Sequence, residues 1–376
     1  MRPLREISVR YRNRIIRAAY KGVLRPIFFM NDPESMHDQV TSAGRWLGHH
    51  PMARGLTRWL FGYGNERLHQ NILGIVFKNP LGLAAGFDKN AELTDILPAI
   101  GFGFAEVGSV TGYPCSGNPK PRLWRLPKSQ SLVVHYGLKN DGCEAISAKL
   151  RGAAFGIPIG MSIAMTNRRE NLDLESAVTD YAKAFRAMEP FGAYVTVNVS
   201  CPNVHGGQPF VVPHKLDRLF DILDEIPTIK PVFIKISPDL DDFELDAFLG
   251  VARRHRIHGI ICTNLTKKRD RSRIIDADVP DIGGLSGKVV QDMSDDMLAR
   301  IYKKEGGRFV LIGCGGVSTA EDAYKKIRLG ASLIQMITGM IFEGPQVVSE
   351  INQGLEKLLE HDGFKTITDA IGVDNC

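Results

Sequence analysis

From about residue 74 onward, short runs of apolar and β-branched residues alternate with stretches of helical periodicity. Eight of the runs have the length and composition of parallel strands buried on both faces. They are Leu81–Ala85, Phe104–Ser109, Ile157–Ala164, Ala193–Val199, Val232–Ser237, Gly259–Thr263, Phe309–Gly313 and Leu333–Ile337. Helical patterns between and after them include Asn171–Glu189, Asp242–His255, Val289–Lys304, Ala320–Leu329 and Gln346–His361. Eight strands, each followed by a crossover connection, predict an α/β fold of the (β/α)8 TIM-barrel class.

A doubly wound parallel sheet is the alternative fold. It normally has fewer units, and a glycine-rich fingerprint follows its first strand. Here the first strand ends in Ala84-Ala85-Gly86-Phe87-Asp88-Lys89, which is not that fingerprint. The barrel is therefore the better prediction.

Two segments interrupt the alternation of strands and helices. Pro121–His135 contains two short strand-like runs around Lys128-Ser129-Gln130, which predicts an inserted β-hairpin after the second strand. Asn264–Lys288 is a long polar excursion after the sixth strand. Long loops in compact domains are often functional.

The first 70 or so residues have a helical and amphipathic pattern instead. Apolar residues from Ile15 to Ile27 recur at helical spacings with basic residues between them, and Asn31-Asp32-Pro33-Glu34 is a helix-start signal. Two further apolar helices follow, around Trp46 and around Trp59. We expect two regions: residues 1–72 as a small N-terminal helical cap, and residues 73–376 as a catalytic barrel. The pattern fits either a packed cap or a membrane-surface element that encloses an apolar passage.

Charge favours the membrane surface for this segment. The whole chain carries a formal net charge of only +5, but its first 25 residues contain eight basic residues and one acid, Glu6. A nucleic-acid-binding protein would carry such charge through its folded domain, so no nucleic-acid partner is expected. No apolar run reaches the roughly 20 residues that span a bilayer, and the N-terminus lacks the features of a signal peptide. We therefore expect a peripheral protein on the cytoplasmic face of a membrane; the sequence does not indicate an oligomeric state.

The six cysteines are scattered along the chain. They are Cys115, Cys143, Cys201, Cys262, Cys314 and Cys376, with no CxxC pair and no Cys/His cluster at zinc spacing. No metal site is expected, and reduced thiols are the simplest interpretation for all of them except Cys201.

Polar residues at the strand ends carry the candidate chemistry, because barrel active sites lie at the carboxyl ends of the strands. Lys89 follows the first strand and suits a substrate carboxylate or phosphate, although a solvated lysine is the simpler alternative. The fourth strand ends in Asn198-Val199-Ser200-Cys201-Pro202-Asn203. Its amides suit the edge of a planar heterocycle. Cys201 is either an inert buried thiol or a reactive group, and its place in this loop favours the second.

The remaining strand ends predict a phosphate at one side of the barrel mouth and a planar ring at its centre. Lys235 lies inside an otherwise apolar strand and needs a partner, which is either an anionic cofactor or an acid on a neighbouring strand. Thr263-Asn264 follows the sixth strand. Gly315-Gly316 opens a helix after the seventh, next to Thr338-Gly339, and such glycine-rich turns bind anions. Flavin mononucleotide (FMN) satisfies both requirements.

At these residues the sequence resembles the dihydroorotate dehydrogenases over nearly its whole length. The matching segments are Gly82-Leu83-Ala84-Ala85-Gly86-Phe87-Asp88-Lys89, Glu106-Val107-Gly108-Ser109-Val110-Thr111, Asn118-Pro119-Lys120-Pro121-Arg122-Leu123, Asn198–Asn203, Lys235, Thr263-Asn264, Gly283-Gly284-Leu285-Ser286-Gly287 and Gly315-Gly316-Val317. The N-terminal helices and Asp32-Pro33-Glu34-Ser35-Met36-His37 resemble the membrane-associated, quinone-reducing class, in which quinone reaches the flavin through a helical cap.

The resemblance implies oxidation of dihydroorotate to orotate in pyrimidine synthesis, with FMN as cofactor and quinone as acceptor. It implies that Cys201 is the general base and that Lys89, Asn198, Asn203 and Asn264 bind the substrate. It implies cofactor contacts for Ala85, Gly86, Ser109, Ser162, Asn198, Lys235, Thr263, Ser286, Gly287, Gly315, Gly316, Thr338 and Gly339. Because a free thiol titrates near ~8.5, we expect Cys201 to be poised closer to neutral pH than a serine would be.

Three positions depart from the family's pattern. The quinone class has serine where Cys201 stands, and cysteine there resembles the soluble class that uses fumarate or NAD. Asparagine is usual at the positions of Val134 and Ser162. The alternatives are therefore a related FMN barrel enzyme with another acceptor or another dihydropyrimidine-like substrate, and a flavin-binding scaffold without catalysis.

Overall fold

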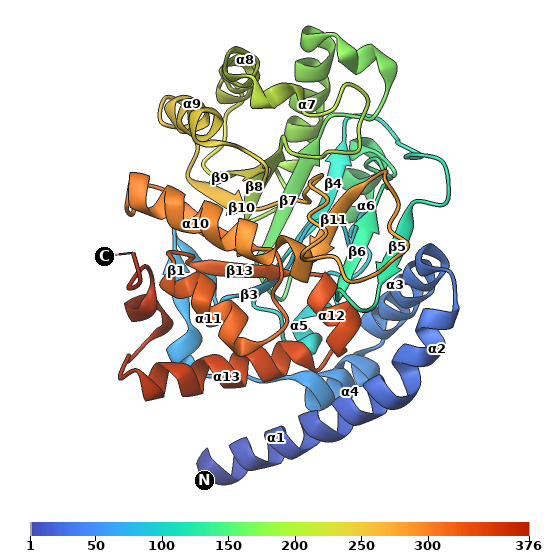
Figure 1. The fold of residues 1–376 in the computed structure, drawn as a ribbon, viewed down its shortest axis with the longest axis vertical. Helices are drawn as coiled ribbons and strands as arrows, with labels where there is room; N and C mark the ends of the chain where they lie inside the picture. Colours follow the sequence, from blue (N-terminus) through green and yellow to red (C-terminus); the bar gives the residue numbers. More distant parts are fainter. Residues whose placement is uncertain (1, 376) are drawn as a thin grey trace.

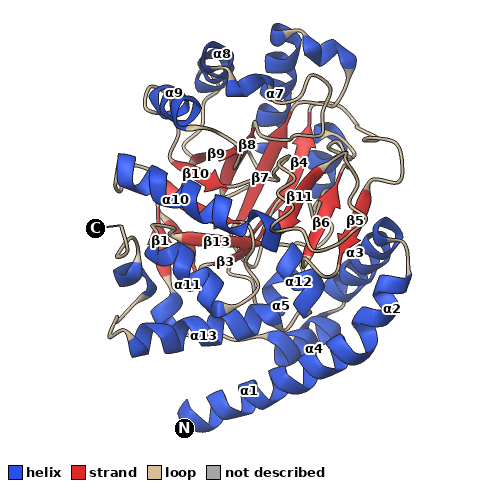
Figure 2. Cartoon of the chain, in the orientation of Figure 1, coloured by secondary structure: helices blue, strands red, loops and turns tan. Residues whose placement is uncertain are grey.

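The chain folds as a closed barrel of parallel strands surrounded by helices (Figures 1 and 2). The computed structural model describes residues 2–375, and side chains from residue 7 onward. Eight strands close the barrel in the order β3-β4-β7-β8-β9-β10-β12-β13. Their bounds are Leu81–Leu83, Phe104–Thr111, Ile159–Ala164, Tyr194–Asn198, Val232–Ile236, Gly259–Cys262, Val310–Cys314 and Leu333–Met336. All eight predicted strands are thus confirmed.

Helices on the outside of the barrel cover the outward faces of the strands. They are α5 (Leu97–Ile100), α6 (Cys143–Leu150), α7 (Leu174–Met188), α8 (Pro213–Asp224), α9 (Asp242–Ala252), α10 (Gln291–Glu305), α11 (Ala320–Arg328), α12 (Thr338–Glu343) and α13 (Val347–His361). The five predicted helices are confirmed to within a few residues. Capping boxes fix where α9 and α11 begin, at Asp241 with Glu244 and at Thr319 with Asp322.

The barrel interior is filled in layers because alternate residues of each strand point inward. Its lower layer is apolar, with Phe104, Tyr194, Phe233, Ile261, Ile312 and Leu333. A short hairpin of β1 (Gln70–Ile72) and β2 (Ile75–Phe77) closes this end, where the Phe77 ring meets Phe104 edge-on at 5.5 Å. The boundary expected between residues 72 and 73 falls in the turn of this hairpin. Because apolar packing closes this end of the barrel, a ligand can bind only at the opposite end, where the carboxyl ends of the strands lie.

A second small sheet lies over those carboxyl ends. The hairpin of β5 (Leu123–Leu126) and β6 (Ser131–Val134) is the predicted insertion. Strand β11 (Gly284–Gly287) pairs antiparallel with β6. The polar excursion after the sixth strand therefore returns to the barrel mouth as a strand, which the sequence pattern did not predict.

The N-terminal segment is helical as predicted and lies along one side of the barrel (Figure 1). Helix α1 (Arg2–Ala19) continues through a π-helical turn, Tyr20–Leu24, into α2 (Arg25–Met30). Helices α3 (Pro33–His49) and α4 (Pro51–Phe61) follow. Asp32 caps α3 by accepting a hydrogen bond from the backbone of Ser35, which confirms the helix-start signal. We call these four helices the cap.

Candidate functional site

One large cavity lies at the carboxyl ends of the barrel strands and encloses about 1250 Å³, including its open mouth. Its walls contain every residue predicted to bind substrate or cofactor except Ser162. Residues separated by up to 254 positions, from Ala85 to Gly339, therefore meet in one place. The loops after the strands and the small sheet together form these walls.

Ser162 lies one layer behind the cavity wall. Its side chain is fully buried on β7, and its hydroxyl oxygen lies 2.7 Å from that of Ser109. Asn198 donates to the same Ser109 oxygen at 2.9 Å. Ser109 faces the cavity, so Ser162 supports a wall residue instead of facing a ligand.

Glycines shape the side of the cavity formed after β12 and β13. Gly315 and Gly316 have φ values of +135° and +74°, a region that L side chains rarely adopt. A Cβ on Gly316 would lie 2.3 Å from Cβ of Gln291, and one on Gly339 would lie 2.0 Å from the carbonyl oxygen of Val317. Among the described residues, the N–H groups of Gly315 and Gly316 have no partner in the loop hydrogen bonds. This turn, which we call the cradle, therefore has the glycine-rich form and the free N–H groups that are typical of anion-binding turns.

Two hydroxyl groups complete this side of the cavity. Ser286 on β11 and Thr338 at the start of α12 lie 2.8 Å apart, oxygen to oxygen. Strand β11 thus carries Ser286 and Gly287 to the cradle from a distant part of the sequence.

A buried cation forms the floor of the cavity. Lys235 on β9 is only 4% exposed, and its Nζ lies 4.0 Å from Sγ of Cys314. Gln335 on β13 also lines the floor, and neither polar atom of its amide has a regular hydrogen bond among the described residues. Lys235 and Gln335 therefore bring a charged and an amide group to the floor of the cavity.

Glu106 lies beneath this floor, on β4. Thr196 donates to its Oε1 at 2.7 Å, and burial raises the pKa of the Glu106 carboxyl. The sequence analysis missed both Gln335 and Glu106. The sequence signal that could have found them is a polar residue at an inward-facing position of an otherwise apolar strand.

Hydrogen bonds to neighbouring protein groups fix the orientation of the amides predicted to bind a planar ring. Asn264 donates to Oδ1 of Asn198 at 3.2 Å and to the Ser200 hydroxyl at 3.1 Å. Asn203 donates to the carbonyl of Val134 at 2.8 Å. The Val134 side chain faces the cavity, together with Leu132 and Leu138. One edge of the site is therefore apolar where the others are polar.

Cys201 is half-buried and faces the cavity. Burial raises the pKa of its thiol to about 11. The surroundings of Cys201 thus move its pKa away from neutral pH, because they stabilise the uncharged thiol. Cys115, Cys143, Cys262 and Cys314 are also free thiols, while Cys376 lies outside the described residues.

Lys89 enters the cavity from the loop after β3. Its Nζ lies 3.2 Å from Nε2 of His37 and 4.3 Å from the centre of the Tyr136 ring. Burial, and repulsion by Lys139, lower the pKa of Lys89 to about 8. Burial and the charge of Lys89 lower the pKa of His37 to about 4, so this imidazole is neutral at pH 7.

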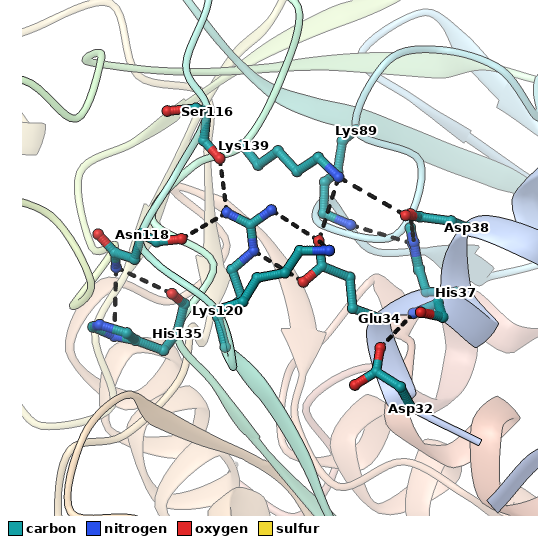
Figure 3. A network of polar contacts seen from close by, with 12 residues as sticks. Asp32, Glu34, His37, Asp38, Lys89, Ser116, Asn118, Lys120, His135 and Lys139 are labelled. Atoms are coloured by element: carbon teal, nitrogen blue, oxygen red, sulfur yellow. Dashed lines mark hydrogen bonds and ion pairs between the residues drawn. The ribbon is translucent and has the colours of Figure 1, made fainter.

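A buried ion pair fastens the cap to the barrel mouth beside Lys89 (Figure 3). Glu34 on α3 accepts two hydrogen bonds from Arg122, at 2.8 and 3.0 Å, and Lys139 lies 3.4 Å away. Burial alone would raise the pKa of Glu34, but Arg122 and Lys139 outweigh it and hold the pKa at about 2. The carboxylate therefore stays charged at neutral pH.

The cap also carries most of the exposed apolar surface. Of the 21 large hydrophobic side chains exposed among the described residues, 12 lie in the first 61 residues. They are Ile7, Tyr11, Ile15, Val23, Leu24, Ile27, Met30, Val40, Trp46, Met52, Leu56 and Trp59. In the part of the chain that the structure describes, no helix has the length and hydropathy to span a membrane.

Sequence comparison connects this arrangement with characterised proteins. The sequence model of the family described as dihydroorotate dehydrogenase matches residues 67–359. A protein of Gloeobacter violaceus named dihydroorotate dehydrogenase (quinone) is 40% identical over 352 residues, which cover 93% of this chain and 97% of that protein. A protein of the same name from Natronomonas pharaonis is 38% identical over 359 residues, covering 94% of this chain and 98% of the relative.

Structure comparison gives the same neighbours. The dihydroorotate dehydrogenase of Eimeria tenella, solved with ferulenol, superposes with a TM-score of 0.81 at 30% sequence identity and covers 91% of this chain and 96% of its own. Its ligand-free form superposes with a TM-score of 0.82, covering 92% of this chain and 100% of its own.

Proposed function

The chain belongs to the dihydroorotate dehydrogenase family, and from that premise we propose that it oxidises dihydroorotate to orotate in pyrimidine biosynthesis and passes the electrons to a quinone. The observation that carries the proposal is one large cavity that brings together a lysine, a thiol, three asparagine amides and a glycine-rich turn. Relatives named for quinone match this chain over more than nine-tenths of its length, so the match extends into the cap.

FMN is the cofactor that the cavity fits. The turn at Gly315, Gly316 and Gly339 would hold the phosphate, and it can keep this shape only because these residues lack a Cβ, which would meet Ser294, Gln291 and Val317. Ser286 and Thr338 would add hydroxyl donors to it, and Gly287 would leave space beside them. Lys235 and Gln335 would meet the polar edge of the ring, and Ala85, Gly86, Ser109, Asn198 and Thr263 would enclose it. When bound, FMN would accept the hydride from C6 of dihydroorotate and hold the two electrons for the quinone.

The chain's own residues bind the substrate and move its proton. Lys89 would pair with the substrate carboxylate, and Asn198, Asn203 and Asn264 would hold the ring through hydrogen bonds. Cys201 would take the proton from C5. Because its pKa is about 11, roughly one thiol in ten thousand is ionised at pH 7. The thiolate is scarce but strongly basic when it forms.

The cap would place the cavity at a membrane surface. Its exposed aromatic and aliphatic side chains are interspersed with arginines, a combination typical of helices that lie in the membrane interface. Tyr20 in the cap donates to the carbonyl of Ile341, a residue that lines the cavity, so the cap lies directly against the site. A quinone dissolved in the membrane would then reach the ring without crossing water. We propose a peripheral location on the cytoplasmic face.

A second candidate is the same barrel chemistry with another acceptor or another dihydropyrimidine. The observation that favours it is the apolar edge at Val134, together with cysteine at position 201. Anaerobic addition of dihydroorotate to the purified flavoprotein tests the substrate, and reoxidation by a soluble quinone, fumarate or NAD tests the acceptor. Bleaching by dihydroorotate and fast reoxidation by quinone alone is expected. Faster reoxidation by fumarate or NAD would favour the second candidate.

A further inference from the structure

A second, smaller cavity adjoins the first between α3 of the cap and the loop after β3. It encloses about 630 Å³ and shares His37, Phe87, Lys89 and Lys139 with the main cavity. The side chains of α3 that line it are His37, Asp38, Thr41, Ser42 and Arg45. We call it the side pocket. The two cavities are therefore adjacent, and Lys89 lines both of them.

The side pocket is polar and contains an unused hydroxyl group. Thr41 is only 7% exposed, and its Oγ1 has no hydrogen-bond partner in the described part of the chain. In α4, by contrast, the buried Thr57 donates to the carbonyl of Ala53, one turn earlier. A buried hydroxyl without a partner is costly, so the Thr41 hydroxyl is available to a polar ligand.

Positive charge predominates along the side pocket. Arg45, Lys89 and Lys139 line it, against Asp38 and Glu92. Arg45 is paired with Glu92 at 2.9 Å, and Lys139 lies 3.9 Å from Asp38. Lys89 has no carboxylate within ion-pair distance among the described residues; its neighbours there are the neutral His37 and the Tyr136 ring. A carboxylate that enters the side pocket would therefore meet a lysine without a carboxylate partner among the described residues; Figure 3 shows Lys89 beside His37.

We propose that the side pocket is the entrance through which the carboxylate of dihydroorotate reaches Lys89, separate from the route proposed above for the quinone. This inference rests on the proposed function. An anion loses much hydration free energy in an apolar passage, whereas Arg45, Thr41 and Lys139 offer it charge and hydrogen bonds along the way. Two entrances let the anionic and the apolar reactant exchange independently at one cavity.

The test uses a substitution that narrows the entrance without touching the binding site. Ser42 is exposed at the side pocket and makes no side-chain hydrogen bond with another described residue, so Ser42→Trp adds bulk there. Ala43 is the next residue, is exposed and lines neither cavity, so Ala43→Trp is the matched control. Stopped-flow absorbance of the FMN-loaded protein mixed with orotate gives the association and dissociation rate constants from the flavin spectrum.

A substitution that only narrows an entrance changes the association and dissociation rate constants by the same factor and leaves the Kd unchanged. We expect Ser42→Trp to slow orotate association and dissociation equally, on the order of tenfold, with an unchanged Kd, while Ala43→Trp stays at the wild-type rates. The rate constant for reoxidation by quinone should not change in either variant. Unchanged orotate rates in Ser42→Trp would overturn the inference, and so would a weaker Kd at an unchanged association rate.

A second, independent test changes the charge at the proposed entrance. Arg45→Glu should slow orotate association about threefold and weaken its salt dependence, whereas Arg45→Lys should keep both. Equal association rates in Arg45→Glu and Arg45→Lys would contradict the inference. Failure of the proposed function would look different, because the wild-type flavin would then not respond to dihydroorotate at all.

Discussion

The barrel mouth and the cap border the same cavity, but they are held together in different ways. The mouth is built from backbone turns and buried polar groups, such as the Gly315-Gly316 cradle and the Lys235 floor, and every element of it is braced by the barrel. The cap is attached by hydrogen bonds and ion pairs of its side chains, such as those of Tyr20 and Glu34, and leaves most of its large apolar side chains in solvent. Under the proposed function, the mouth would hold a charged cofactor and the cap would admit an apolar reactant, two tasks that need opposite kinds of surface. Each can then be altered without the other.

The cofactor cradle should be the most sensitive part of the molecule. A side chain at Gly339 meets the carbonyl oxygen of Val317, which the backbone cannot move away cheaply. Gly339→Val should therefore lose FMN almost completely, with an increase in Kd of at least about a hundredfold, while vesicle binding by the cap is kept. Flavin fluorescence on dialysis measures the loss. Retention of FMN would show that the phosphate lies elsewhere.

Removal of the thiol should abolish chemistry but not cofactor binding. Cys201→Ala is expected to slow anaerobic bleaching by dihydroorotate on the order of a thousandfold, because proton removal is lost while the cradle is intact. Cys201→Ser is the informative companion, since it replaces the thiol by a hydroxyl group. Bleaching of the alanine variant at the wild-type rate would remove Cys201 from the mechanism.

Two pKa values predict how the bleaching rate depends on pH. With saturating dihydroorotate the rate should rise about tenfold per pH unit from pH 7 to pH 10, because the pKa of Cys201 is about 11 and the thiolate fraction grows throughout this range. At low dihydroorotate the increase should flatten above pH 8, because Lys89, with a pKa of about 8, loses the charge that binds the carboxylate. Stopped-flow absorbance measures both profiles. A saturated rate that levels off near pH 7 would mean that bound substrate and flavin lower the thiol pKa.

The ion pair between the two regions should affect stability and the quinone reaction. Glu34 and Arg122 have side chains only 3% and 6% exposed. Loss of one partner in Glu34→Gln should cost about 3 kcal/mol of unfolding free energy, or a fall in Tm on the order of 5 °C. Reoxidation by quinone should slow more than reduction by dihydroorotate. Glu66→Gln, an exposed residue with no ion pair among the described residues, is the control.

The smallest effects should come from the apolar surface of the cap. Trp46, Leu56 and Trp59 are 59%, 58% and 69% exposed. Their joint replacement by alanine should weaken binding to anionic vesicles about tenfold or more and leave the reaction with soluble quinone unchanged. Deletion of residues 1–30 should weaken vesicle binding too. Phe243→Ala, which removes an equally exposed ring outside the cap, is the control; equal vesicle binding by all variants would remove the membrane proposal.

The barrel was predictable because its signals are local. Each strand, such as Val232–Ile236, is an apolar run within a few residues, and the loops that follow carry their polar residues next to it in the sequence. The strand-end rule of barrels then placed Lys89, Cys201 and the Gly315-Gly316 turn at one mouth, where the structure has them.

Features that depend on distant contacts were not predictable in this way. Strand β11 exists because it pairs with β6, about 150 residues earlier, and its glycines and serine give no local strand signal. The pKa of Cys201 depends on how completely the folded loop excludes water. The side pocket forms only where α3 of the cap meets the loop after β3. Neither segment has a local sequence pattern that predicts their contact.

The most direct test of the account is the visible spectrum of the purified protein, recorded without oxygen before and after one equivalent of dihydroorotate and again after a soluble quinone. The account predicts an oxidised flavin spectrum, loss of its absorbance with dihydroorotate, and full recovery with quinone. A colourless protein that takes up no FMN, or a flavin that dihydroorotate leaves unchanged, would contradict it.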